Sequence, residues 1–222
     1  MKSSTALRAL VLTFSLGLSG LAQANLLTSG SFELGNFTSQ GFDTQTFTAG
    51  ATTLTGWTTI GNFVSWIGKT NPYQLSAQDG DFFLDLTGFH TGSPFGGVSQ
   101  TVTTTPGQQY DLSFYLGSYT ARWGGPPVSI MASVAGTSQT FTDNTHSSQS
   151  TWTLEHMLFK ATGSTTVITL TGTAGVEYIG LDNVSLTAVP EPSVWELVLI
   201  GFASLGLIAH ARTKKGTTLS PG

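Results

Sequence analysis

Cysteine is absent from the 222-residue chain, and charged residues make up only 9% of it. The fold therefore cannot rely on disulfides, and no thiol is available as a nucleophile. Between residues 25 and 189, three basic residues (Lys69, Arg122 and Lys160) stand against ten acidic ones, which gives a net charge of −7. Nucleic acids and anionic lipid surfaces require basic patches, so both are excluded as partners, whereas neutral partners and cations fit this composition.

Amphipathic helical patterns are also missing from residues 25–189. Apolar and polar residues instead alternate in short runs, which are residues 82–86, 110–116, 128–134, 166–170 and 184–186. Gly, Pro, Asn or Asp residues bound these runs, for example at Asp79-Gly80 and Pro106-Gly107. Period-2 runs without helices predict an all-β fold, an antiparallel β-sandwich that forms a single domain. The Thr/Gly-rich stretch 36–55 predicts a long loop or an irregular strand.

Catalytic patterns are weak. Ser99 lacks the second glycine of a nucleophile elbow and falls inside a predicted strand. The three histidines of the domain have no ligand spacing, and nothing places the late glutamates Glu155 and Glu177 together as a glycosidase pair. We therefore expect a protein that is not an enzyme.

The N-terminal residues 1–24 are typical of a secretory signal peptide. Lys2 and Arg8 form its basic region, residues 9–18 its apolar core, and Ala22-Gln23-Ala24 a small-x-small cleavage site. The mature protein is then expected to begin at Asn25, and an uncleaved signal anchor is the alternative.

The C-terminal segment contains two prolines, an uncharged helix and a basic cluster in that order. Pro190 and Pro192 interrupt any regular structure, and residues 197–209 carry no charge. A transmembrane helix over about residues 194–209 would rise ~24 Å against a hydrocarbon core of ~30 Å. The cytoplasmic basic cluster comes next, ahead of the polar tail 216–222; it consists of Arg212, Lys214 and Lys215. Cations at the cytoplasmic end would place residues 25–189 outside the membrane.

The order Pro190-Glu191-Pro192, short apolar helix, basic cluster resembles the PEP-CTERM sorting signal of Gram-negative bacteria, here over residues 190–215. This resemblance implies an exosortase as partner and an association with exopolysaccharide and biofilm genes. It further implies transient anchoring in the inner membrane before the protein reaches the cell surface or the extracellular matrix. An ordinary single-pass anchor is the alternative.

The domain itself resembles galactose-binding-like jelly rolls, which include carbohydrate-binding modules. The resemblance rests on the opening segment 25–33, on Gly97-Val98-Ser99-Gln100-Thr101-Val102, and on the closing segment 179–186. It implies one structural calcium ion bound between Glu33 and Asp182. Because calcium takes six to eight oxygen ligands, backbone carbonyls would have to complete the site. The alternative interpretation is that these two carboxylates bind backbone amides.

Aromatic residues in polar segments predict a glycan platform. Trp123 stands beside Arg122 in a Gly-rich segment, and Trp66 and Tyr73 flank a second polar loop; Trp57, in contrast, is predicted to lie in the core. Indole and phenol rings can stack on the apolar face of a pyranose. The sequence therefore predicts a non-catalytic exported protein that binds polysaccharide. A structural matrix or adhesion protein without specific glycan binding is the alternative, and a glycan-active enzyme is the third hypothesis.

Overall fold

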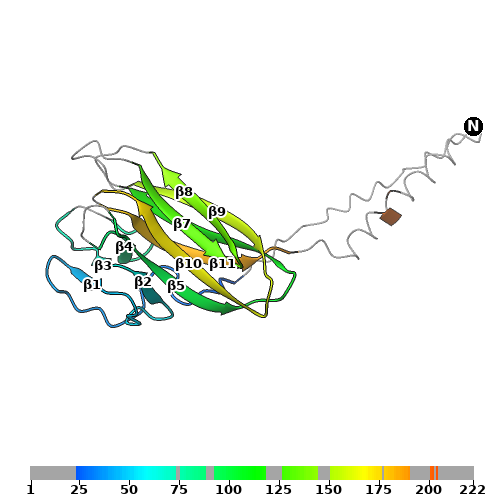
Figure 1. Cartoon of the computed structure of the whole chain (residues 1–222), viewed down its shortest axis with the longest axis horizontal. Coiled ribbons are helices and arrows are strands. Elements are labelled where there is room, and N and C mark those ends of the chain that lie inside the picture. Colours follow the sequence, from blue (N-terminus) through cyan, green and yellow to red (C-terminus); the bar gives the residue numbers. More distant parts are fainter. Residues whose placement is uncertain are drawn as a thin grey trace, which may run out of the picture.

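The computed structural model describes residues 24–73, 76–88, 93–118, 127–144, 151–176, 178–190, 201–202 and 204 (Figure 1). The proposed signal peptide, except its last residue, lies outside this range. So do Glu191 and Pro192 of the sorting motif and the basic cluster Arg212, Lys214 and Lys215. No helix within the described residues is long and apolar enough to cross a membrane.

The described residues form an antiparallel sandwich of two sheets, which confirms the predicted fold class (Figure 1). The six-stranded sheet has the order β1-β3-β4-β11-β6-β9, and the five-stranded sheet has the order β2-β5-β10-β7-β8. The strands are β1 (Thr44–Phe47), β2 (Thr58–Gly61), β3 (Val64–Gly68), β4 (Phe82–Asp85), β5 (Gly96–Thr103), β6 (Gln109–Ser118), β7 (Val128–Val134), β8 (Thr137–Asp143), β9 (Thr151–Lys160), β10 (Thr165–Ala174) and β11 (Gly180–Ala188).

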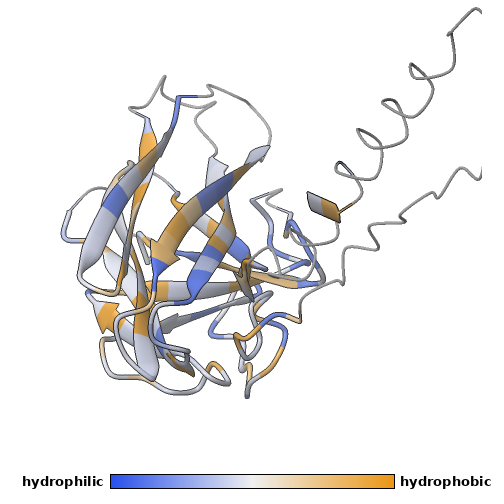
Figure 2. Ribbon diagram, turned by 90° about the vertical axis from the view of Figure 1, so that its right-hand side faces the viewer, coloured by the Kyte–Doolittle hydropathy of each residue, from blue (hydrophilic) through white to orange (hydrophobic). Residues whose placement is uncertain are grey.

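The alternation in the sequence decides which side chains form the core between the sheets. In β6, Leu112, Phe114 and Leu116 are buried, whereas Asp111 and Ser113 point to the outer face. Figure 2 shows the same alternation of apolar and polar residues along the strands. Burial of the inward row against the facing sheet supplies the main stabilisation, about 1.5–3 kcal/mol per large apolar side chain.

The N-terminal segment runs alongside the last strand rather than forming a strand of its own. The Leu26 N–H donates to the Leu186 carbonyl at 2.9 Å, and the Val184 N–H donates to the Gly30 carbonyl at 2.9 Å. Chain segments far apart in the sequence are thus adjacent in space. The stretch 36–55 contains the short strand β1, and its Leu54 forms an isolated bridge with Gly35 just before it, in keeping with an irregular strand.

Candidate functional site on the connection between β3 and β4

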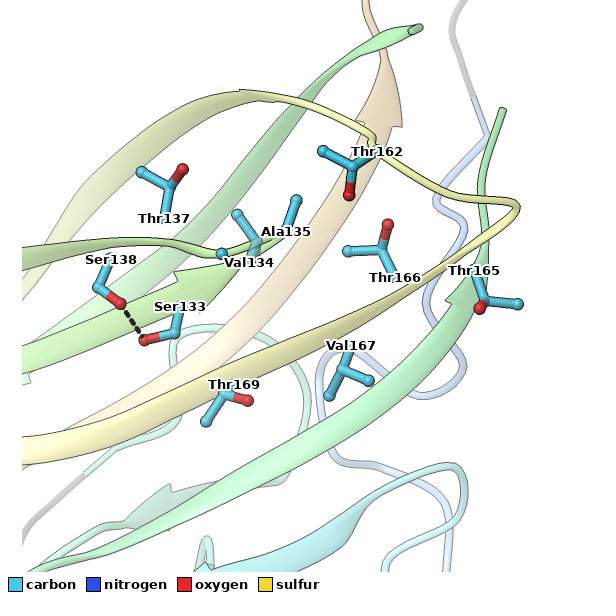
Figure 3. Close-up of a pocket in the computed structure, with 11 residues that line it drawn as sticks. Ser133, Val134, Ala135, Thr137, Ser138, Thr162, Thr165, Thr166, Val167 and Thr169 are labelled. Atoms are coloured by element: carbon cyan, nitrogen blue, oxygen red, sulfur yellow. Dashed lines mark hydrogen bonds between the residues drawn. The ribbon is translucent and has the colours of Figure 1, made fainter. Parts of the chain in front are cut away.

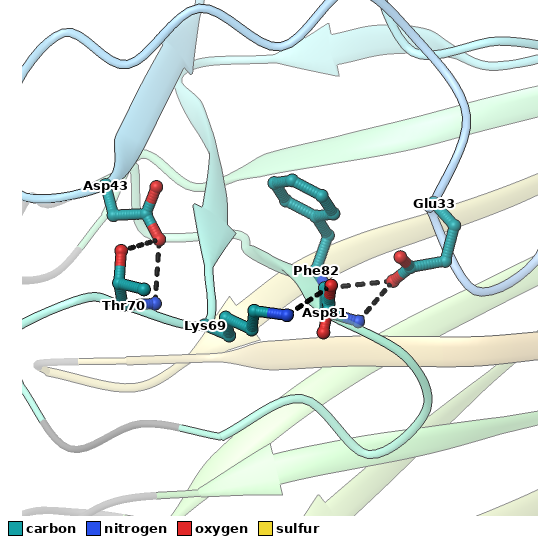
Figure 4. A network of polar contacts seen from close by, with 6 residues as sticks. All are labelled: Glu33, Asp43, Lys69, Thr70, Asp81 and Phe82. Atoms are coloured by element: carbon teal, nitrogen blue, oxygen red, sulfur yellow. Dashed lines mark hydrogen bonds and ion pairs between the residues drawn. The ribbon is translucent and has the colours of Figure 1, made fainter.

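Three carboxylates from distant parts of the chain bind the connection between β3 and β4, residues 69–81. The first is Asp43, whose Oδ2 accepts the backbone N–H of Thr70 at 2.7 Å and its hydroxyl at 2.6 Å (Figure 4). The Gly68 N–H donates to the Asp43 carbonyl at 2.8 Å, so the turn before β1 is fixed to the end of β3. Hydrogen bonds to ionised acceptors are stronger than neutral ones, and this anchor therefore positions the start of the connection.

The second carboxylate is Glu33, which binds the end of the connection. Its Oε1 accepts the N–H of Asp81 at 2.9 Å and that of Phe82 at 2.8 Å (Figure 4). Gly80 lies against this carboxylate with φ +73°, and a Cβ there would collide with Glu33. Glycine is required at this turn both for its left-handed backbone and for the space that Glu33 occupies.

The third carboxylate is Asp182 in β11. Its Oδ2 accepts the N–H groups of Gln78 at 2.7 Å and Asp79 at 3.0 Å, and its Oδ1 accepts that of Asn183 at 2.7 Å. The side chain is fully buried, at 0% exposure. Burial raises the pKa of Asp182 to about 7, while the N–H donors of Asp79, Asn183 and Gln78 act in the opposite direction. Desolvation outweighs the hydrogen bonds, so ionisation of this carboxyl costs free energy in the folded state.

Ser76 and Ala77, in the second half of the connection, lie on the outer face of the six-stranded sheet. The Trp152 indole N–H donates to the Ser76 carbonyl at 3.0 Å, and Ala77 packs against a small buried cluster of Ile67, Phe83 and Tyr178. This cluster is separate from the core between the sheets. The packing of Ala77 on this cluster, together with the Trp152–Ser76 hydrogen bond, holds this part of the connection against the sheet.

An exposed aromatic pair lies where the connection leaves β3. The rings of Phe42 and Tyr73 have centroids 6.1 Å apart at an interplanar angle of 58°, and the residues are 70% and 40% exposed. Phe42 and Asp43 both have left-handed backbones, with φ of 55° and 56°. Such a conformation is uncommon for a bulky residue and is often found at functional sites. The Tyr73 N–H donates to Asn71 Oδ1 at 3.2 Å, which fixes the other half of the pair.

Two charged side chains, Lys69 and Asp81, lie on the same connection as Tyr73. Lys69 Nζ lies 2.7 Å from Asp81 Oδ2, in an ion pair whose side chains are 63% and 49% exposed (Figure 4). Asp81 raises the pKa of Lys69, which therefore remains charged at neutral pH. Because both side chains are well exposed, the two groups are accessible to hydroxyls of a ligand, and the pair itself contributes little to stability.

The structure corrects the interpretation of Trp66. This residue is 1% exposed, and its indole N–H donates to the Phe32 carbonyl at 3.0 Å inside the core. Its ring packs against Phe37 and Phe82. Trp66 belongs to β3 and points between the sheets, so it cannot form part of a surface platform. Trp57 is also 1% exposed, which confirms its predicted place in the core.

The other predicted glycan contacts divide into two groups. Tyr73 is on the surface, as expected, and its partner Phe42 was missed by sequence reasoning. The only signal for Phe42 was its place in Gly41-Phe42-Asp43, within a stretch interpreted as weakly patterned. Trp123 and Arg122 lie outside the described residues, in the segment between the end of β6 and the start of β7.

The predicted metal residues Glu33 and Asp182 come together on one short segment, residues 78–82. Both accept backbone amides, as the alternative interpretation requires. A bound cation would nevertheless offset the cost of ionising buried Asp182. Calcium takes six to eight oxygens, and the described part of the chain has no group of three or more His, Cys, Asp or Glu side chains that could hold a metal. The two carboxylates therefore fit calcium only if backbone carbonyls complete the site.

Residues 25–179 match the model of a family described as "Protein of unknown function (DUF642)". No curated protein matches the chain.

Among solved structures, the chain is similar to three carbohydrate-binding modules. The first is TmCBM61, solved in complex with beta-1,4-galactotriose, at 19% identity over 75% of this chain and 99% of that chain, with a TM-score of 0.47. The second is the CBM22-1 xylan-binding domain from Paenibacillus barcinonensis Xyn10C, at 20% identity over 67% of this chain and 94% of that chain, with a TM-score of 0.41. The third is a family 35 carbohydrate-binding module from Clostridium thermocellum, at 14% identity over 66% of this chain and 93% of that chain, with a TM-score of 0.40.

Proposed function

We propose that this chain, which belongs to the DUF642 family of proteins of unknown function, is a non-catalytic protein that binds a neutral or weakly acidic polysaccharide through Phe42 and Tyr73. The observation that carries the proposal is the exposed ring pair held in place by Asp43 and Asn71. The solved structures mentioned above are described as sugar-binding, but the proposal rests on this surface.

The chemistry of the ring pair suits a sugar. A pyranose presents an apolar face of C–H groups that can cover an aromatic ring, and a rim of hydroxyls that needs hydrogen-bond partners. Lys69 and Asp81 lie on the same connection and supply a donor and an acceptor. The backbone anchors at both ends of the connection hold the rings in place before binding, so less conformational entropy is lost on association.

The charge of the domain selects the class of polymer. A net charge of −7 over residues 25–189 repels strongly anionic chains and leaves neutral or weakly acidic glycans as ligands. Trp123 with Arg122 is retained as a second proposed contact, in which the guanidinium would pair with a uronate carboxylate.

Export, sorting and calcium belong to the same proposal. The protein would leave the cytoplasm through residues 1–24, be processed by an exosortase at the motif Pro190, Glu191 and Pro192, and act at the cell surface or in the extracellular matrix. Calcium would be held by Glu33 and Asp182. It would stabilise the connection that carries the ring pair and take no part in chemistry.

Retention of the purified protein on secreted polysaccharide from the same cells tests the function. We expect retention that neutral oligosaccharide competes away and that persists at high salt. Absence of retention on every neutral glycan of an array would favour the alternative, a structural matrix or adhesion protein. Release of reducing sugar during the assay would contradict the non-catalytic assignment.

A further inference from the structure

The strands at the four edges of the two sheets differ in how well they are protected from pairing with another chain. An exposed edge strand is a template for intermolecular pairing unless it is short, charged, bulged or interrupted by proline. β1 and β2 have four residues each, and β9 carries Glu155, His156 and Lys160. β8 has seven residues, and its only charged residue is the last, Asp143. β8 thus combines length with none of these protective features over residues 137–142.

The exposed edge of β8 has a defined geometry. A two-residue turn joins it to β7, with φ of 49° at Ala135 and 80° at Gly136, and all seven β8 residues are in register with β7. Such a turn makes the closing residues Val134 and Thr137 a hydrogen-bonded pair. The backbone N–H and C=O groups therefore point away from β7 at every second residue, namely Ser138, Thr140 and Thr142.

The outer face beside this edge is uncharged and rich in hydroxyl groups. Ser133 and Ser138 share a 2.8 Å hydroxyl hydrogen bond across β7 and β8, and Ser129 and Thr142 share another of 2.8 Å. Ser133 and Ser138 line a shallow hollow of about 440 Å³. Figure 3 shows the residues that line it, among which Thr165 and Thr169 of β10 contribute further hydroxyls. None of the described residues of this face carries a charge that would repel a strand of the same composition.

We propose that β8 pairs antiparallel with β8 of a second copy of this chain, so that two five-stranded sheets form one continuous sheet. With Thr140 on the two-fold axis, Ser138 lies opposite Thr142 of the second copy. These pairs repeat the hydroxyl contacts already present between β7 and β8. The symmetric contact uses the same strand on both copies and closes at a dimer.

The sequence of β8 favours a second copy over a foreign strand. Hydroxyl side chains pair well with themselves across strands, and an uncharged strand offers no electrostatic selection for a charged partner. Long-range repulsion between two domains of net charge −7 opposes the dimer, and salt screens this repulsion. Association should therefore strengthen as the salt concentration rises, unlike a contact made by opposite charges.

Sedimentation of the purified protein without glycan tests the proposal independently of sugar binding. We expect a concentration-dependent dimer that is tighter at high salt. Thr140→Lys should raise the dimer Kd at least tenfold because like charges would face each other on the axis. The control Thr101→Lys adds the same charge to an exposed position on the same face, in β5, and should leave the Kd within threefold.

Thr140→Pro provides a second variant. It removes an N–H that points away from β7, so β7–β8 pairing should survive while the dimer is lost. Circular dichroism confirms folding, and hydrogen exchange should slow at Ser138, Thr140 and Thr142 as the protein concentration rises. A protein that stays monomeric up to about 1 mM overturns the proposal. So does a dimer that both folded Thr140 variants retain.

Discussion

The centroid of the Phe42 ring lies 6.1 Å from that of the Tyr73 ring. Phe42 precedes β1 in the chain, and Tyr73 follows the end of β3. Asp43 brings them together, because it follows Phe42 in the chain and binds Thr70 near Tyr73. The two rings therefore form one exposed aromatic surface, and truncation of either ring is the most direct test of the proposed glycan site.

Phe42→Ala and Tyr73→Ala should each weaken polysaccharide binding at least tenfold, which corresponds to about 1.4 kcal/mol. Phe42 and Tyr73 are 70% and 40% exposed, so the melting temperature should change by only a few degrees. Binding is measured by isothermal titration or affinity electrophoresis. Leu158→Ala is the matched control, because Leu158 is 60% exposed on β9.

Unchanged binding in both variants, with folding intact, would place the glycan site elsewhere. Trp123→Ala then becomes the informative variant, with Arg122→Ala beside it for uronate-containing polymers. A tenfold loss there would move the site to the segment between β6 and β7.

Trp66→Ala should destabilise the fold by about 3–5 kcal/mol, as expected for truncation of a buried aromatic residue. The indole N–H bond to the Phe32 carbonyl and the contacts with Phe37 and Phe82 are lost together. Urea unfolding followed by tryptophan fluorescence measures the change, and Tyr73→Ala provides the surface control. A Trp66→Ala variant of native stability that fails to bind glycan would restore the earlier interpretation.

Chelation should lower the melting temperature if calcium binds at Glu33 and Asp182. A ligand that binds only the native state adds about 2.7 kcal/mol at a hundredfold excess over its Kd. Asp182→Ala should remove the difference between calcium and chelator, although it also destabilises the connection by itself. Identical melting curves with and without chelator in the wild-type protein would exclude a structural calcium.

The stability of the metal-free protein should fall as the pH rises from about 4 to about 7. Burial raises the folded-state pKa of Asp182 to about 7 from its ordinary value of 3.8. The folded state therefore holds its proton more tightly than the unfolded state in this window, and the stabilising contribution is lost as the pH passes the folded pKa. Asp182→Asn should flatten the profile in denaturant titrations at each pH, and an equal slope in both proteins would contradict the assignment.

The intact mass of the exported protein tests the sorting signal. Removal of the segment beyond about residue 190 should leave a chain that begins at Asn25 and ends near Pro190. The same measurement on a Glu191→Ala variant should show the full C-terminal segment retained in the membrane. Full-length wild-type protein recovered outside the inner membrane would refute processing.

Sequence reasoning succeeded where the chain pattern alone determines the structure. Side chains in a strand alternate between the two faces, so the run from Tyr110 to Leu116 was sufficient to predict a strand with one buried row. Repetition of such runs without helical periodicity was sufficient for an antiparallel sandwich. Composition likewise set the net charge of residues 25–189, on which the proposed class of glycan depends.

Only the tertiary structure decided which aromatic residues are on the surface. Trp66 and Tyr73 stand seven residues apart beside the same polar loop, yet one lies between the sheets and the other in solvent. Phe42 became a candidate because Asp43 bonds to the far end of β3, and Glu33 and Asp182 met on one segment because β11 lies next to β4. These contacts join residues up to about a hundred positions apart, and a local pattern carries no information about such pairings.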